Sequence, residues 1–78
     1  MKDELYKVFC EVFGHEKVKS SKRLSKEYCY GWDSLKNLEL MVAVENKFET
    51  KFSLEDLERI TSFNDILDIL DKKQNAEG

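Results

Sequence analysis

The chain has 78 residues, of which 41% are hydrophobic and 37% are charged, and its formal net charge is −3. This composition is typical of a small soluble globular protein. The sequence has no run of about 20 apolar residues, the length that a membrane-spanning helix needs. A chain of this length buries only about 60% of its unfolded surface. We therefore expect one domain over residues 1–78, and not an enzyme with an enclosed catalytic cavity.

The charge is divided unequally along the chain. Residues 1–32 carry seven basic and five acidic side chains, whereas residues 33–78 carry six basic and eleven acidic ones. The net charges of +2 and −5 disfavour nucleic acid as a partner of the second part, because the phosphate backbone attracts cations. Basic protein surfaces are better partners for it.

The N-terminus and the cysteines indicate a compartment. No apolar stretch follows Met1, so we expect no signal peptide and a cytoplasmic protein. Cys10 and Cys29 are far apart in the sequence, and in a reducing compartment we expect two free thiols. Together with His15 they lack the spacing of metal-ligand pairs, so we assign no metal site.

The first predicted helix covers residues 3–13, because its apolar side chains recur at helical spacing. These side chains are Leu5, Val8, Phe9, Val12 and Phe13. Gly14 is a natural helix stop. Residues 14–32 are then expected to form a long connection that contains five basic residues. We interpret these basic side chains as solvated, with a phosphate-binding or partner-binding site as the alternative. Leu24, Tyr28 and Tyr30 are candidates for holding this loop against the core.

Three further helices are predicted after the loop. The second helix covers 34–49, a short one covers 54–60, and the last begins at Phe63. Ser53 with Asp56, and Ser62 with Asp65, resemble capping boxes at the starts of the last two. The fold class is therefore all-α, a small four-helix bundle of three longer helices and one short helix. We expect the ordered core to span about 3–71 and the tail 72–78 to be frayed.

The second helix has two apolar arcs. At 100° per residue, one arc is a core stripe, and the other lies 60–180° away and is interspersed with carboxylates. The core stripe contains Leu40, Met41, Val44 and Phe48; the second arc contains Leu35, Leu38 and Val42, with Glu39 and Glu45 among them. The second arc is either a partner-docking face or a second buried surface of a central helix, and the pattern leaves both open.

The most informative segment of the chain is Gly31-Trp32-Asp33-Ser34-Leu35. Asp33 is a good N-cap residue, because its carboxylate accepts from unpaired N–H groups of the following turn. Ser34 then lies in that turn, where the N–H groups and the helix dipole favour an anion. The segment predicts a site for a phosphorylated serine. Trp32 beside it is either a structural plug or a contact for a bound group or partner.

The same residues resemble an acyl carrier protein, of the phosphopantetheine-binding carrier family. The resemblance extends over nearly the whole chain and runs without a gap from Asp33 to Leu70. Its motifs are Asp33-Ser34-Leu35, Glu39-Leu40, Glu45, Phe48 and Ile60-Thr61-Ser62-Phe63. The tripeptide is specific because it precedes an amphipathic helix in a domain of this length and helix order.

The resemblance implies a monomeric four-helix bundle with phosphopantetheine on Ser34, and with Asp33 and Leu35 completing the attachment motif. A phosphopantetheinyl transferase would install the group from coenzyme A. The arm would hold acyl intermediates as thioesters and deliver them to enzymes with basic docking surfaces, without catalysis by the chain itself. The docking residues would be Leu35, Leu38, Glu39, Val42 and Glu45. The acyl chain would enter a cavity bounded by Leu40, Met41, Val44, Phe48, Ile60 and Ile66.

The chain also departs from typical fatty-acid carriers. Lys36, Asn46 and Lys47 occupy positions that are usually acidic, and Trp32 replaces a smaller residue. With these departures the chain resembles carriers of specialised pathways more than the housekeeping fatty-acid carrier. The pathway is therefore either fatty-acid biosynthesis, within lipid metabolism, or a specialised acyl or polyketide-type pathway. An aminoacyl or peptidyl carrier and an unmodified helical adaptor remain as alternatives. A hydrolase is disfavoured, since no Gly-x-Ser-x-Gly turn surrounds Ser34.

Overall fold

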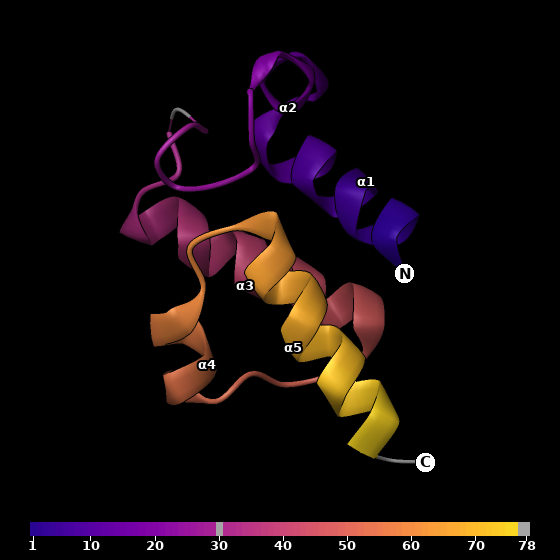
Figure 1. Ribbon diagram of the computed structural model, residues 1–78. Helices are drawn as coiled ribbons and strands as arrows, with labels where there is room; N and C mark the ends of the chain where they lie inside the picture. The colour runs from indigo at the N-terminus through magenta and orange to yellow at the C-terminus, as the bar shows by residue number, and fades with distance from the viewer. Residues whose placement is uncertain (30, 77–78) are drawn as a thin grey trace.

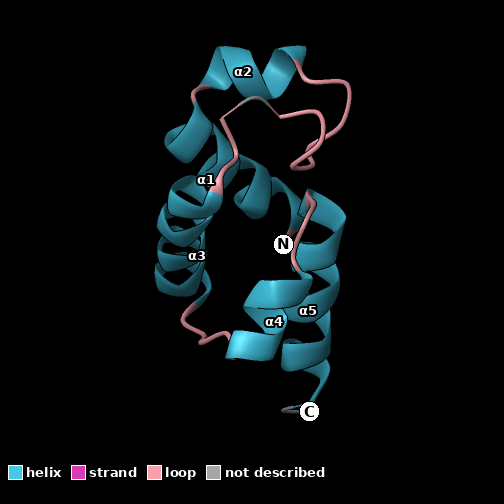
Figure 2. Cartoon of the chain, turned by 90° about the vertical axis from the view of Figure 1, so that its left-hand side faces the viewer, coloured by secondary structure: helices cyan, strands magenta, loops and turns pink. Residues whose placement is uncertain are grey.

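The computed structural model describes residues 1–29 and 31–76, the last three of them by their backbone alone. These residues form five helices and no β-strand. The helices are α1 (Lys2–Phe13), α2 (His15–Ser20), α3 (Ser34–Phe48), α4 (Leu54–Arg59) and α5 (Phe63–Ala76). In Figure 1 α5 lies in front of α3, and Figure 2 shows α2 and α4 at opposite ends of the molecule. The fold is a small all-α bundle.

Helix α2 corrects the prediction of four helices joined by an uninterrupted loop over 14–32. Six residues after Gly14 form a helix instead. Its only buried residue is Val18, and a single apolar position gives no helical period to detect. Gly14, with a φ of 95°, turns the chain between α1 and α2. The loop that remains runs from Ser21 to Asp33.

The other helix boundaries agree with the predictions to within one or two residues. The exception is the C-terminal end of the last helix. The predicted helices over 3–13, 34–49 and 54–60 correspond to α1, α3 and α4. Helix α5 continues to Ala76, five residues beyond the end of the expected ordered core. Residues 77 and 78 of the expected frayed tail lie outside the described residues, as does Tyr30.

Hydrogen bonds and aromatic packing hold the long loop in place. The backbone N–H of Lys26 donates to the carbonyl of Thr61 (2.8 Å), and that of Phe63 donates to the carbonyl of Leu24 (2.7 Å). These bonds tie the loop to the α4–α5 junction. Leu24 is half-buried against the core, as expected, whereas Tyr28 is 44% exposed, with the Arg23 guanidinium 5.8 Å from its ring centroid.

Two carboxylates stabilise the starts of α4 and α5. Asp56 accepts from the N–H of Ser53 and donates its own N–H to the Ser53 hydroxyl, which is the predicted capping box. Asp65 accepts from the N–H and the hydroxyl of Thr61, each at 2.9 Å. In each case the donated backbone N–H is the main cause that lowers the pKa of the carboxyl group.

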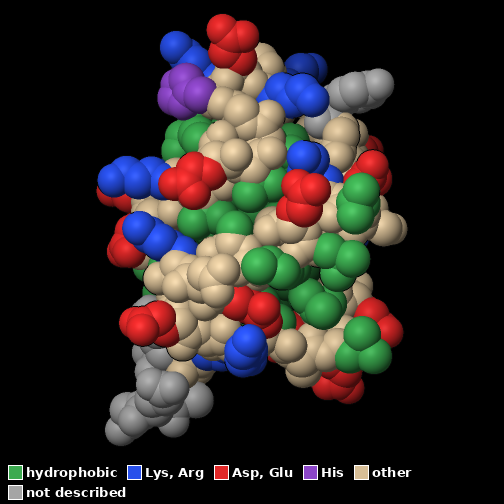
Figure 3. Space-filling model, turned by 180° about the vertical axis from the view of Figure 1, so that it is seen from behind, with side chains coloured by type: hydrophobic (Ala, Val, Ile, Leu, Met, Phe, Trp, Pro, Cys, Tyr) green, Lys and Arg blue, Asp and Glu red, His purple; other side chains and the backbone are tan. Residues whose placement is uncertain are grey.

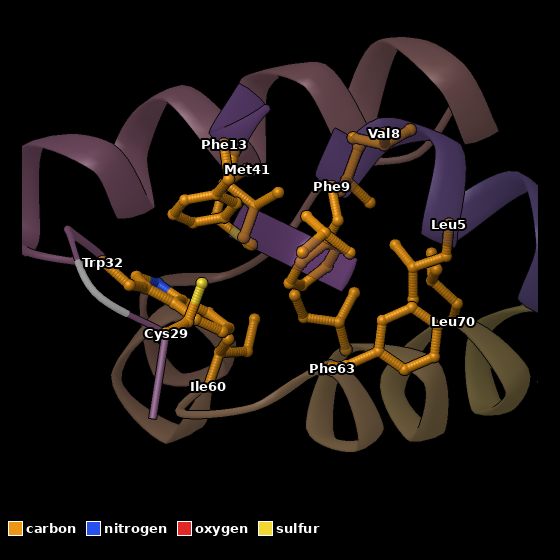
Figure 4. Packing of buried hydrophobic residues seen from close by; sticks show 14 residues of the cluster. Leu5, Val8, Phe9, Phe13, Cys29, Trp32, Met41, Ile60, Phe63 and Leu70 are labelled. Carbon is orange, nitrogen blue, oxygen red and sulfur yellow. The ribbon is translucent and has the colours of Figure 1, made fainter. Parts of the chain in front are cut away.

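The core is centred on an aromatic cluster between α1, α3 and α5, whose packing Figure 4 shows. Phe9 is fully buried, and its ring lies 5.7 Å from Phe13, 5.4 Å from Trp32 and 5.2 Å from Phe63, measured between centroids. Such tilted and edge-on pairs stabilise the core beyond the contribution of the area that the rings bury. Phe48, expected in the core stripe, is instead half-buried at its edge.

Replacing Phe9 tests this packing. Phe9→Ala should lower the free energy of unfolding by about 3–5 kcal/mol, because it leaves a cavity among three rings. That is a large part of the about 4–12 kcal/mol expected for a domain of this size. Urea denaturation followed by circular dichroism measures the loss. Phe48→Ala is the matched control and should cost clearly less; equal losses would contradict the assigned centre of the core.

Candidate functional site

The predicted phosphoserine site lies at the first turn of α3. Asp33 is the N-cap, with a φ of −100°, and its Oδ1 accepts a hydrogen bond from the backbone N–H of Lys36 at 2.8 Å. The Asp33 carbonyl accepts from the N–H of Asn37, also at 2.8 Å. Ser34 is the first helical residue, and its side chain is exposed. The geometry of the predicted cap is confirmed.

The start of α3 fits an anionic ester on that serine. The helix has 15 residues, and its first turn contains no acidic side chain. The positive end of the helix dipole is therefore opposed only by the capping carboxylate of Asp33. Lys36 lies in the same turn, and its Nζ pairs with Glu39 at 3.2 Å. A phosphodiester on Ser34 would lie near the N–H groups at the start of the helix. No residue within the first turn would repel it with a carboxylate.

Trp32 proves to be a structural plug. Its side chain is buried, with the ring 5.4 Å from Phe9 and 5.6 Å from Phe13 between centroids. The indole Nε1–H donates to Oδ1 of Asn37 at 2.9 Å. Figure 4 shows Trp32 inside the core beside Cys29 and Ile60. The residue two positions before Ser34 is thus anchored to α1 and to α3.

Sequence reasoning missed Asn37. Among the described residues it is the one buried polar side chain, with 8% exposed. A signal was present, because Asn37 stands three, four and seven residues before Leu40, Met41 and Val44 and so extends the core stripe. A polar residue on the buried face of a helix needs a hydrogen-bond partner, and Trp32 is that partner here.

The second apolar arc of α3 is exposed, which excludes a second buried surface on this helix. Leu35, Leu38 and Val42 are 68%, 56% and 56% exposed, and Leu54 of α4 is 73% exposed. Figure 3 shows a group of exposed hydrophobic side chains on one face, with acidic side chains next to them. We call Leu35, Leu38, Val42 and Glu39 the α3 face. Contiguous exposed apolar side chains of this kind mark interaction surfaces.

Glu39 and Glu45 differ in their surroundings. Glu39 is exposed and pairs with Lys36 on the same helix. Glu45 is half-buried, and its Oε2 accepts from the backbone N–H of Phe52 at 2.8 Å. The Glu45 carboxylate therefore fixes the connection between α3 and α4, a role that its helical position did not indicate.

The residues expected to bound an acyl cavity lie together in the core. Leu40, Met41, Val44, Ile60 and Ile66 are buried, and Phe48 packs at their edge. A pocket of about 660 Å³ lies elsewhere, between the start of α1, residues 23–28 and the start of α5, and none of the six lines it.

Other kinds of site receive no support from the described parts of the chain. Residues 1–29 and 31–76 contain no group of three His, Cys, Asp or Glu side chains arranged to hold a metal ion. Within the same residues, no helix is both long enough and apolar enough to cross a membrane. Cys10 and Cys29 are free thiols. At the start of α3 the chain presents the exposed hydroxyl of Ser34 next to the capping carboxylate of Asp33.

Comparison with known families identifies the class of protein to which the chain belongs. The family model described as a phosphopantetheine attachment site matches residues 3–70. The chain belongs to this family of carrier domains. Its members carry phosphopantetheine as a covalent group, which a transferase attaches. The match includes α1 to α4 and most of α5, and it therefore contains Ser34 and the exposed residues beside it.

Proposed function

We propose that this chain is an acyl carrier protein whose phosphopantetheine is attached to Ser34. The observation that carries the proposal is the exposed hydroxyl of Ser34 at the first position of a capped helix, in a chain of the phosphopantetheine attachment family. When bound, phosphopantetheine supplies a thiol that holds acyl groups as thioesters. The chain itself acts as a carrier and performs no catalysis.

The residues around Ser34 have separate tasks in this proposal. Asp33 caps α3 and keeps the first N–H groups in a fixed direction. Those groups and the helix dipole stabilise the phosphodiester. Leu35 continues the attachment motif on the exposed side of the helix. The hydroxyl is thereby offered on a rigid element, while the long arm beyond it keeps its cargo at high local concentration near a docked enzyme.

The α3 face is the proposed docking surface for the transferase and for acyl-processing enzymes. Its exposed apolar residues supply buried area in a complex, and Glu39 supplies a negative charge. Basic surfaces on the partners complement the acidic part of the chain, residues 33–78. Glu45, expected to share this role, contributes through the shape of the α3–α4 connection instead. We place the cargo among fatty-acid or specialised acyl and polyketide-type intermediates, with aminoacyl or peptidyl cargo as the alternative.

Intact mass tests the attachment. After incubation with coenzyme A and a promiscuous phosphopantetheinyl transferase, the parent chain should gain the mass of one phosphopantetheine. Ser34→Ala should gain none, because the acceptor hydroxyl is gone. The variant should keep the parent's helical circular dichroism, since the Ser34 side chain is exposed and Asp33 provides the cap. A modified Ser34→Ala chain, or a parent that stays unmodified beside a modified control carrier, would refute the proposal.

Charge reversal tests the docking surface. Glu39→Lys should raise the KM of the transferase for the carrier at low salt, because it places a cation where a basic partner docks. Thermal stability should change little, since the side chain is exposed. Glu11→Lys, an equally exposed change on α1, is the matched control. If the two variants raise KM to the same extent, net charge and not the α3 face determines binding.

A further inference from the structure

We propose that Trp32 and Asn37 form a positioning pair that holds the first turn of α3, and with it Ser34, in the orientation that the transferase requires. The inference rests on the proposed function, because it concerns the same serine. Neither side chain belongs to the attachment motif, and neither is exposed enough to contact the transferase. Trp32 is 5% exposed and Asn37 is 8% exposed.

The buried indole of Trp32 requires a hydrogen-bond acceptor for its Nε1–H. Trp32 is buried against Phe9 and Phe13 of α1, where water does not reach its Nε1–H. A buried indole N–H without a partner is destabilising, so the acceptor fixes where the ring lies. That acceptor is Oδ1 of Asn37, at 2.9 Å. The ring is therefore held by aromatic contacts with α1 and by a hydrogen bond with α3.

Hydrogen bonds on both sides of Ser34 fix the backbone of the first turn of α3. Asn37 also donates its backbone N–H to the Asp33 carbonyl (2.8 Å), and Lys36 donates its backbone N–H to the Asp33 carboxylate (2.8 Å). Residues 32 and 33 are thus each bonded to the first turn that follows them. Ser34 lies between these hydrogen-bonded residues, and its own side chain is exposed. A shift of the indole moves the backbone two residues before the hydroxyl.

The polar character of the Trp32–Asn37 pair is not needed for filling the core. Phenylalanine at 32 with leucine at 37 would leave no polar group to satisfy, although the phenyl ring is smaller than the indole and leaves part of its space unfilled. Replacing both partners of a buried hydrogen bond with apolar groups is close to neutral for stability. A satisfied buried polar contact instead selects one arrangement of the packed groups. The pair therefore contributes orientation at the site more than it contributes stability.

The experiment compares four variants with the parent in transferase kinetics and thermal melting. Trp32→Phe and Asn37→Leu each remove one partner, and the double variant removes both. Asn46→Leu, an exposed change on the same helix, is the control. Loss of the pair should lower kcat for phosphopantetheine transfer by about tenfold or more, since a displaced acceptor hydroxyl costs rate steeply. KM should change by less than about twofold, because the α3 face is unaltered.

The double variant separates positioning from folding. It should melt above the Trp32→Phe variant, because the same smaller ring is present but no buried polar group is left unpaired, and yet keep the low kcat. A double variant with the parent's kcat would overturn the inference. So would single variants that lower kcat only in proportion to their unfolded fraction. A parent that the transferase does not modify at all refutes the proposed function instead, and the inference falls with it.

A direct readout of the bond is available because the chain has a single tryptophan. Its indole N–H gives one resolved signal in a proton–nitrogen correlation spectrum. That proton should exchange slowly with solvent in the parent and in Asn46→Leu, and quickly in Asn37→Leu. Rapid exchange in the parent would contradict the hydrogen bond to Asn37.

Discussion

The burial of the Trp32 indole against α1 is the contact on which the arrangement of the site depends. The indole has one polar atom, and its hydrogen bond to Asn37 connects the loop, the core and the first turn of α3. Phe9, at the centre of the core, contacts the same ring and Phe63 of α5. The hydrophobic core and the start of α3 are consequently a single packed unit, with Ser34 at its surface.

The two sides of α3 serve different purposes. One side buries Leu40, Met41 and Val44, which hold the helix against the rest of the bundle. On the other side Leu35, Leu38 and Val42 are each more than half exposed to solvent. A small domain gains stability from every apolar group that it buries, and the exposure of these three therefore supports the proposed docking surface. The proposed carrier function uses both sides, one for rigidity and one for docking.

Much of this was predictable because it depends on local sequence. Helical spacing located α1, α3 and α5, and the Ser53–Asp56 capping box located α4. The Asp33 cap likewise follows from neighbouring residues. Helix α2 has too few apolar positions to show a period. The bonds from Trp32 to Asn37 and from Phe52 to Glu45 depend on which side chains the fold buries. Periodicity alone likewise did not distinguish an exposed second arc of α3 from a buried one.

The central claim is that Ser34, among several serines at helix starts, bears the phosphopantetheine. Ser53 precedes α4 and Ser62 precedes α5, and both use their hydroxyls to accept N–H bonds within their own caps. Ser34 stands one residue inside its helix, where Asp33 provides the cap and the hydroxyl is left exposed. Peptide mapping by fragment-ion mass spectrometry of the modified chain distinguishes the three. The account predicts the added mass on Ser34 alone; the same mass on Ser53 or Ser62 would contradict it.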